Sequence, residues 1–365
     1  MRTRRPRLLY LINSFDRGGA EQAPFRLLAG GAFDGLDVEI LALMRGAGAL
    51  PARVANTGWI DPAPQMTLRR LAQAADALRP RLQGLDALVL ALPQANLLGR
   101  LLAPTQRKPL ILSFEHNTRL ANRAYELGYW ITSRRVDWML SDCEETARRA
   151  RARLYRRPPP RETVLPLVSF APGRPWPLRP LANRPLELVS ASRLTAAKQP
   201  GRLVGAVARL HALGRPARLT LYGDGPLRQS LEAQIRAEGL ETWVRLPGHD
   251  PGWRERGPAD AFVLASRHEG LCIAALEAMS VGLPVVAPAV GGLRDYGSAG
   301  GALLTSDKPA DLAASVLQVV GDEAQRRHRS EAAVRLATTR YGAEQVNALY
   351  RRFNGELQAV LASRS

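Results

Sequence analysis

Two glutamates, Glu269 and Glu277, are the residues of this sequence whose types and spacing best suit chemistry. On one helix, their separation corresponds to a rotation of about 80° beyond two turns and a rise of about 12 Å, which places both carboxylates on one side. A carboxylate such as Glu277 can accept two hydrogen bonds from a vicinal diol. Considered alone, however, the two residues are better explained as surface glutamates of a helix.

A glycine next to the first glutamate predicts a phosphate site. Gly270 lies where an expected strand (261–265) has ended and a helix begins. There the free backbone N–H groups of Leu271, Cys272 and Ile273 can hold a phosphate, and the glycine lets a ligand approach. Amide N–H groups that bind a phosphate, together with a carboxylate that binds a diol, suit a sugar nucleotide as the ligand.

The elements around these residues alternate between strand and helix along the whole chain. Apolar strand-like runs followed by amphipathic helical runs are typical of parallel, doubly wound sheets. A proline-rich stretch between Pro158 and Pro185 interrupts the alternation and is interpreted as an interdomain linker. We therefore expect an N-terminal domain over residues 1–172, a C-terminal domain over 173–342, and a final helix, 343–365, that packs back on the N-terminal domain.

The charge balance is strongly basic, with 51 Lys and Arg against 33 Asp and Glu in 365 residues, a formal net charge of +18. Only three of the cations are lysines, namely Lys108, Lys198 and Lys308. The first 172 residues carry +11, and the densest basic run extends from Arg148 to Arg161. This run is either a solvated helix face or a surface for an anionic membrane.

Several classes of protein are excluded or made improbable by what the sequence lacks. Two cysteines cannot build a disulfide framework, and no His/Cys cluster has zinc spacing. The position of the third glycine in a dinucleotide fingerprint is occupied by Arg228, and no P-loop is present. No segment resembles a signal peptide or a membrane-spanning helix, so a cytoplasmic protein is expected. Because the histidines and cysteines are scattered, no metal site is expected.

The second domain resembles the retaining GT-B glycosyltransferases of family 4, the glycosyl transferases group 1, whose hallmark is Glu-x7-Glu. Ser192-Arg193-Leu194 followed by Lys198 is similar to the phosphate-binding element of that family. The loop 221–226 resembles its Gly-x-Gly-Pro loop, and 282–286 with the glycine pair 291–292 resembles its strand and turn after the glutamate helix.

The resemblance extends to two features of the first domain. Gly18 and Gly19, followed by Ala20-Glu21, are similar to a loop that closes over the donor pyrophosphate. His116 falls where such enzymes often keep an active-site histidine. The resemblance implies a GT-B fold, two Rossmann-like doubly wound domains that face a cleft.

The resemblance also implies a reaction, in which a hexose moves from a nucleoside-diphosphate sugar to a hydroxyl of a glycan or lipid-linked acceptor with retention and without a divalent metal. Arg193 and Lys198 would stabilise the leaving diphosphate, with the helix start after Gly270 helping. Glu269 would hold the donor sugar and Glu277 the ribose. Polysaccharide or lipopolysaccharide synthesis, as a peripheral protein at the inner face of the cytoplasmic membrane, is the expected context.

The sequence departs from the family pattern at several positions. Glu269-Gly270 is followed by Leu271-Cys272 where the family has Phe-Gly, and Lys198 is followed by Gln199 where it has glycine. The Asn-Gly-Val-Asp of the family corresponds to residues 167–170, Leu-Val-Ser-Phe, and its glutamate after the double glycine corresponds to Asp295. These changes keep open a catalytically silent GT-B binding protein. A basic nucleic-acid-binding protein is a second alternative, although no known nucleic-acid motif is present.

Overall fold

The chain folds into two compact units. Unit 1 comprises residues 1–168 and 344–365, and unit 2 comprises residues 169–343. The structure, a computed structural model, describes residues 4–15, 19–46, 56–63, 67–116, 120, 122–170, 175–182 and 184–364. The sequence placed the first boundary at residue 172. Phe170 is grouped with unit 2 because its N–H donates to Tyr341 O at 2.9 Å and its carbonyl accepts from Ala343 N at 3.0 Å.

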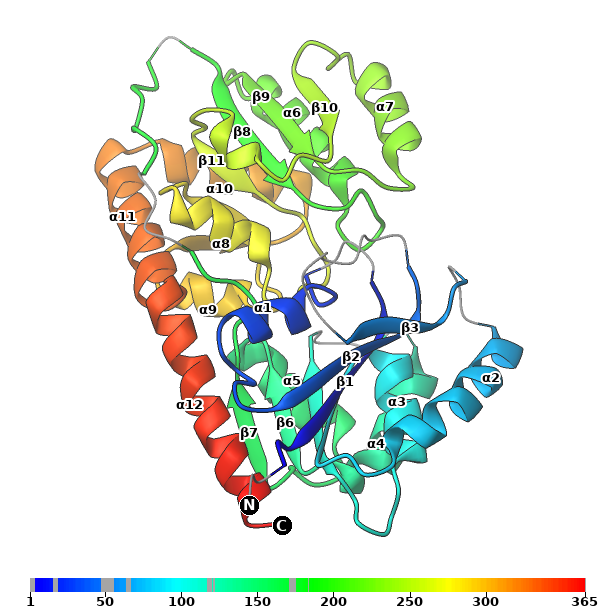
Figure 1. Ribbon diagram of the computed structural model, residues 1–365. Helices are drawn as coiled ribbons and strands as arrows, with labels where there is room; N and C mark the ends of the chain where they lie inside the picture. Colours follow the sequence, from blue (N-terminus) through cyan, green and yellow to red (C-terminus); the bar gives the residue numbers. More distant parts are fainter. Residues whose placement is uncertain are drawn as a thin grey trace. The chain divides into compact units, whose positions relative to one another are not determined.

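Unit 1 contains a seven-stranded parallel sheet in the order β3-β2-β1-β4-β5-β6-β7 (Figure 1). Its strands are β1 (Arg7–Ser14), β2 (Asp37–Met44), β3 (Thr57–Asp61), β4 (Ala87–Ala91), β5 (Leu110–Glu115), β6 (Trp138–Ser141) and β7 (Arg161–Val164). The central strand β4 is buried along its whole length. Such continuously apolar strands form because helices cover both faces of a parallel sheet.

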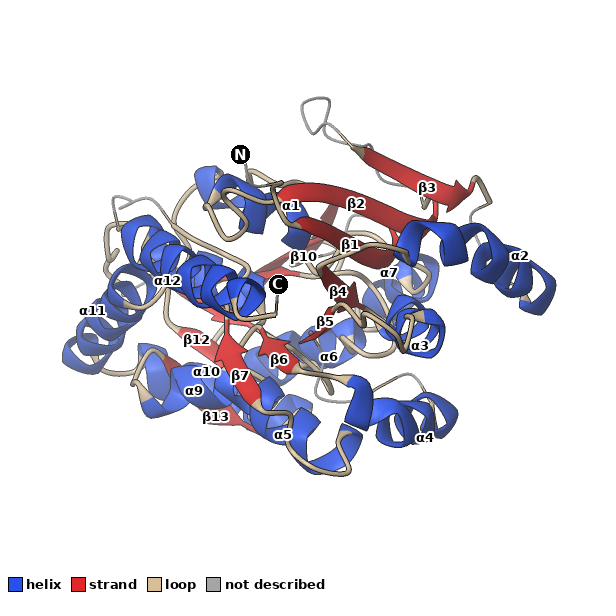
Figure 2. Ribbon diagram, turned by 60° about the horizontal axis from the view of Figure 1, so that its bottom comes forward, coloured by secondary structure: helices blue, strands red, loops and turns tan. Residues whose placement is uncertain are grey.

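The helices of unit 1 lie on both sides of this sheet (Figure 2). They are α1 (Ala23–Ala29), α2 (Leu68–Leu78), α3 (Pro93–Leu102), α4 (Arg123–Thr132), α5 (Glu144–Leu154) and α12 (Ala343–Ala362), with short 3-10 turns η1 (Arg79–Leu82) and η2 (Ser133–Arg135). Leu8, Tyr10 and Ile12 of β1 pack in one core with α1 and α12. Leu9 and Leu11 point into a second core with α2 to α5, as the two-residue period of a strand requires.

The C-terminal helix α12 packs on unit 1 through buried residues on one face. Phe353 meets the ring of Trp138 edge-on, with centroids 5.2 Å apart, and the Tyr350 hydroxyl donates to the Pro166 carbonyl. The chain therefore ends in the unit where it began.

Unit 2 contains a six-stranded parallel sheet in the order β10-β9-β8-β11-β12-β13. Its strands are β8 (Leu186–Ala191), β9 (Ala217–Tyr222), β10 (Val244–Gly248), β11 (Ala261–Val263), β12 (Val285–Pro288) and β13 (Ala302–Thr305). Its helices are α6 (Pro200–Ala212), α7 (Arg228–Ala237), α8 (Ile273–Ser280), α9 (Leu293–Ser298), α10 (Pro309–Val320) and α11 (Glu323–Thr339), with the 3-10 turn η3 (Trp253–Glu255). Helices α6, α7 and α10 share one core with the sheet, and α8 packs against β12 and α11.

The predicted fold class is confirmed, because each unit is a parallel, doubly wound α/β sheet. The cleft expected between the two domains stays a prediction. Two strands, β3 and β13, were absent from the sequence-based assignment. Both are short strands at the sheet edge, without a continuously buried run that marks a central strand.

The basic run 148–161 is partly neutralised by ion pairs within unit 1. Four of its arginines bind carboxylates: Arg148 and Arg149 bind Glu145, Arg151 binds Glu162 and Arg153 binds Glu126. These pairs favour a solvated helix face over a membrane surface for this part of the run. No helix among the described residues is both long enough and apolar enough to cross a membrane.

Candidate functional site

The carboxyl ends of β8 and β11 bring the predicted phosphate and sugar residues together in unit 2. These strands are neighbours at the centre of the sheet, where the strand order reverses. Loops that leave adjacent strands at such a switch point diverge and leave room for a ligand. Lys198 follows β8 and Glu269 follows β11, and the Lys198 ammonium lies 2.6 Å from the Glu269 carboxylate.

The Lys198–Glu269 ion pair is only slightly open to solvent, since the side chains are 25% and 7% exposed. Burial alone would lower the pKa of Lys198, but the charge of the neighbouring Glu269 carboxylate outweighs it and raises that pKa. The lysine therefore stays cationic. A backbone hydrogen bond of 2.8 Å from Arg267 N to Ala197 O ties the two loops together nearby.

Arg193 lies in the same loop after β8, five residues before Lys198, and its side chain is exposed. Its guanidinium has no ion pair or hydrogen bond with any residue that the structure describes. The charges of Arg193 and Lys198 repel each other, which opposes the raised pKa of Lys198. An exposed cation beside a second cation is suited to a ligand that carries more than one negative charge.

The glycine loop after β9 supports the loop that carries Arg193. Gly223 has φ +133, and a Cβ there would lie 1.9 Å from the Ser192 carbonyl oxygen, so no other residue fits. Leu194 N donates to Asp224 O at 2.9 Å. The loop 223–226 that the sequence matched to Gly-x-Gly-Pro therefore acts here as a close-packed support for residues 192–194.

The sequence analysis placed Glu269 and Glu277 on one helix, and the structure of residues 269–272 shows that this was wrong. Helix α8 begins at Ile273, so Glu269 precedes the helix and the helical spacing between Glu269 and Glu277 does not apply. Gly270 accepts from Gly292 N at 2.7 Å, and a Cβ on Gly291 would lie 2.3 Å from the Glu269 carbonyl oxygen. The double glycine thus allows the two loops to pack backbone against backbone.

The start of α8 offers backbone donors where the sequence expected them. The carbonyl of Cys272 already accepts from Ala275 N and Leu276 N, at 3.1 and 3.4 Å. The N–H groups of Leu271, Cys272 and Ile273 have no backbone acceptor among the described residues. Leu271 itself is buried, and its carbonyl accepts from the Tyr296 hydroxyl.

The two departures from family glycines occupy left-handed backbone. Cys272 has φ 55 and ψ 64, and Gln199 has φ 51 and ψ 47, each at the residue that precedes a helix. Side chains other than glycine are strained in this region by about 1–2 kcal/mol. Burial, and then the charge of Glu269, raise the pKa of the Cys272 thiol well above its ordinary value, so its sulfur is protonated.

Glu277 lies on α8 and is held by a residue that the sequence did not single out. The indole Nε1 of Trp253 donates to Glu277 Oε2 at 3.3 Å. Trp253 is buried and stacks on Phe262, with ring centroids 5.5 Å apart. No local pattern marks Trp253, because its role depends on the packing of η3 beside α8.

His116 follows β5 in unit 1 and is buried. Its ring stacks on Phe114 with centroids 4.3 Å apart, and neither ring nitrogen has a hydrogen-bond partner among the described residues. Burial lowers the pKa of His116 from 6.5 to about 3, so the imidazole is neutral. Gly19 lies in an exposed turn after β1, and Gly18 lies outside the described residues.

A buried polar cluster fixes the end of β5 from which His116 extends. Glu115 Oε1 accepts from the hydroxyls of Ser113 and Tyr155, both at 2.7 Å, and lies 3.6 Å from the Arg100 guanidinium. Arg100 is fully buried and also donates to the Ser113 hydroxyl at 2.7 Å. Sequence reasoning missed this cluster, because its members come from three separate elements.

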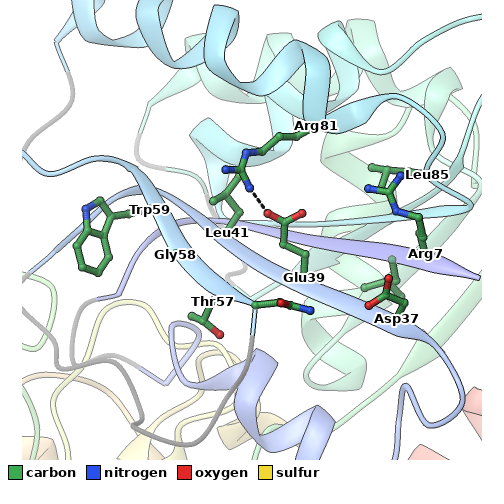
Figure 3. A pocket seen from close by; sticks show the side chains of 11 residues that line it. Arg7, Asp37, Glu39, Leu41, Thr57, Gly58, Trp59, Arg81 and Leu85 are labelled. Atoms are coloured by element: carbon green, nitrogen blue, oxygen red, sulfur yellow. Dashed lines mark hydrogen bonds and ion pairs between the residues drawn. The ribbon is translucent and has the colours of Figure 1, made fainter.

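A cavity of about 510 Å³ in unit 1 lies away from these residues. It is lined by residues of β1, β2 and β3, including Arg7 and Asp37 at the amino ends of their strands. Figure 3 shows Arg81 pointing at Glu39 across it, and these two side chains form an ion pair. Sites in parallel α/β sheets form at the carboxyl ends of strands, so this cavity is not the candidate site.

Comparison with known proteins connects the geometry of unit 2 to a family. Residues 179–335 match the family described as "Glycosyl transferases group 1". The alpha-D-kanosaminyltransferase of Streptomyces kanamyceticus is 31% identical over 182 residues, 47% of this chain and 46% of that protein. The amylovoran biosynthesis glycosyltransferase AmsK of Erwinia amylovora is 35% identical over 127 residues, 32% of this chain and 31% of that protein.

The chain therefore spans less than half the length of these curated relatives. A solved structure aligns over more of it. Anabaena HepE in complex with UDP and glucose covers 98% of this chain and 100% of its own, with a TM-score of 0.74 and 17% identity. This likeness shows a shared GT-B fold. Residues 179–335, which make up most of unit 2, are similar to the glycosyl transferases group 1 family.

Proposed function

We propose that this chain is a retaining, metal-independent glycosyltransferase that moves a hexose from a nucleoside-diphosphate sugar to a hydroxyl of a glycan or lipid-linked acceptor. The observation that carries the proposal is the ion pair of Lys198 and Glu269 at the switch point of unit 2. Arg193 lies in the same loop as Lys198 and forms no ion pair with a residue that the structure describes. Two cations, amide donors and a carboxylate are the groups that a diphosphate and a sugar need.

The diphosphate would bind first to the cations. Arg193 and Lys198 lie in one loop, and the N–H groups at the start of α8 lie after the neighbouring strand. As the bond between the anomeric carbon and the phosphate oxygen breaks, negative charge grows on that oxygen. Fixed cations and amide dipoles stabilise this charge more than they stabilise the ground state, which accelerates the reaction without a metal.

The carboxylates would position the rest of the donor. Once Lys198 turns to the diphosphate, Glu269 can accept hydrogen bonds from the hydroxyls of the sugar. Glu277, oriented by Trp253, can accept from the ribose diol. The acceptor oxygen would then bond to the anomeric carbon on the face that the phosphate leaves, and its proton would pass to the leaving phosphate oxygen.

The donor is tested by a thermal-shift screen of nucleoside-diphosphate sugars that starts with UDP-glucose, because HepE was crystallised with UDP and glucose. A ligand that binds the native state raises the unfolding midpoint. Transfer is then measured as nucleotide release in the presence of a chelator, and the anomeric configuration of the product by NMR.

Variants separate the site from the rest of the chain. Lys198→Ala and Glu269→Ala should abolish transfer, whereas Lys308→Ala, which removes another lysine of unit 2, should leave it unchanged. Binding of a donor without transfer or hydrolysis would support the catalytically silent alternative. No shift with any nucleotide sugar, or transfer that survives both site substitutions, would contradict the proposal.

A further inference from the structure

The cavity of about 510 Å³ beside β1, β2 and β3 is a polar pocket that the candidate site does not use. Its volume lies within the range of pockets that bind small molecules, about 300–1,000 Å³. The cavity is accessible from solvent, because the side chains of Arg81 and Glu39 are 52% and 27% exposed and Asp37 is exposed as well. It is therefore a candidate site for a second ligand.

The open space of the cavity depends on a glycine in β3. Gly58 pairs with Leu41 of β2, so a side chain at residue 58 would lie on the same face of the sheet as Leu41 and Glu39. A Cβ on Gly58 would have one neighbour within 4 Å among the described residues, Leu41 Cδ1 at 4.0 Å. The sheet face around Gly58 is therefore uncovered, with the ion pair of Arg81 and Glu39 on the same side (Figure 3).

The polar groups of the cavity balance in charge, and some of them have no partner within the protein. The guanidiniums of Arg7 and Arg81 are matched by the carboxylates of Asp37 and Glu39. Arg7 and Asp37 are paired in the sheet register, but neither forms an ion pair with any residue that the structure describes. The buried hydroxyl of Thr57, which also lines the cavity, has no hydrogen-bond partner among these residues. A ligand that both donates and accepts hydrogen bonds would satisfy these groups.

We infer that this cavity is a second carbohydrate site, which binds a neutral glycan. A sugar hydroxyl donates one hydrogen bond and accepts others, so it can bridge the carboxylate of Asp37 and the guanidinium of Arg7. The side chains of Leu41 and Leu85 offer apolar contact to the C–H groups of a pyranose ring. The four charged side chains have a net charge of zero in a chain of +18, so the cavity does not select a phosphate or a nucleotide.

The cavity lies apart from the carboxyl edge of the sheet in unit 1, from which His116 extends. Strand β2 runs from Asp37, which lines the cavity, to Met44, a distance of about 23 Å along an extended strand. A single hexose in the cavity does not reach that edge. The role of the site therefore rests on the proposed function: the cavity would hold a long glycan acceptor while the end of that glycan is extended.

Binding is tested by saturation-transfer NMR and isothermal titration of the full chain with neutral tri- and tetrasaccharides of glucose, galactose, mannose and N-acetylglucosamine. We expect at least one of these series to bind. Lys198→Ala, which disrupts the proposed diphosphate site, should bind the same oligosaccharide as tightly as the wild type does. That result would place the oligosaccharide outside the candidate site of unit 2.

Variants locate the bound oligosaccharide. Gly58→Leu should abolish binding, because the added side chain fills the cavity, whereas Gly355→Leu, at an exposed glycine of α12, should have no effect. Asp37→Ala should weaken binding at least tenfold, because it removes a charged hydrogen-bond acceptor. Asp76→Ala, at an exposed aspartate of α2, is the matched control. Circular dichroism checks that each variant is folded, and Asp37→Ala decides the outcome if Gly58→Leu does not fold.

Three results would overturn the proposal: no binding of any of the oligosaccharides, binding that Gly58→Leu and Asp37→Ala leave unchanged, or tighter binding of a free amino acid or a sugar phosphate at this cavity. The measurements need neither a nucleotide sugar nor transfer. Failure of this inference is therefore distinguishable from failure of the proposed glycosyltransferase function.

Discussion

Because Lys198 and Glu269 form an ion pair, substitutions of these two residues should change the affinity for UDP in opposite directions. Glu269→Gln removes a carboxylate that competes with the diphosphate for Lys198, 2.6 Å away. A partly exposed ion pair is worth about 1 kcal/mol, so releasing the lysine should tighten UDP binding about fivefold. Lys198→Met removes a charged hydrogen-bond donor to the diphosphate, which costs about 1.5–3 kcal/mol, or roughly ten- to 150-fold in affinity.

Glu269→Gln should not give the same gain in affinity for a complete donor, UDP-glucose. Glu269 is proposed to hold the sugar hydroxyls, so Glu269→Gln should shrink or remove the extra affinity of UDP-glucose over UDP. Isothermal titration of the wild type and of each variant with both ligands measures these differences. Glu241→Gln, at an exposed glutamate of unit 2, is the control. Weaker UDP binding by Glu269→Gln, or unchanged binding by Lys198→Met, would refute the exchange of partners.

Three further predictions follow from the described contacts. Cys272→Gly should be more stable than Cys272→Ala by about 1 kcal/mol, seen as a midpoint about 2–4 °C higher in thermal unfolding, because only glycine relieves the left-handed backbone; equal midpoints would contradict the strain. Trp253→Phe keeps the ring but loses the donor to Glu277, so the preference for UDP over 2′-deoxy-UDP should fall several-fold in titrations, and an unchanged preference would exclude a positioning role. The pKa of His116 is about 3 in the folded protein, below the ordinary value of 6.5, so the unfolded chain binds more protons as the pH falls. From about pH 7 to about pH 5 the wild type should therefore lose about 2 kcal/mol more unfolding free energy than His116→Asn in urea titrations, and equal losses would contradict a buried, neutral imidazole.

The sequence predicted the fold class well because the signal is local. Apolar runs such as β1 and β4 are buried on both faces, and amphipathic helices follow them. Edge strands such as β3 were missed, since half-buried short strands lack that signal. Gly270 and Ile273 were predicted at the start of a helix, and α8 does begin at Ile273.

The candidate site was predicted in part. Glu269 was expected on the helix with Glu277, but the chain stays non-helical through Cys272, whose left-handed backbone begins α8. Trp253 was not predicted at all. Its hydrogen bond to Glu277 joins two elements that are not neighbours in the chain.

The sequence by itself determined the alternation of strands and helices, the close-packed glycines and the types of residue available for a diphosphate and a sugar. Only the tertiary structure decided that Lys198 and Glu269 form an ion pair, and that Arg151 and Arg153 pair with Glu162 and Glu126. The physical reason is that secondary structure follows from short-range sterics and periodicity. Which charges and apolar side chains meet depends on strand order and helix packing, which bring together residues far apart in the chain.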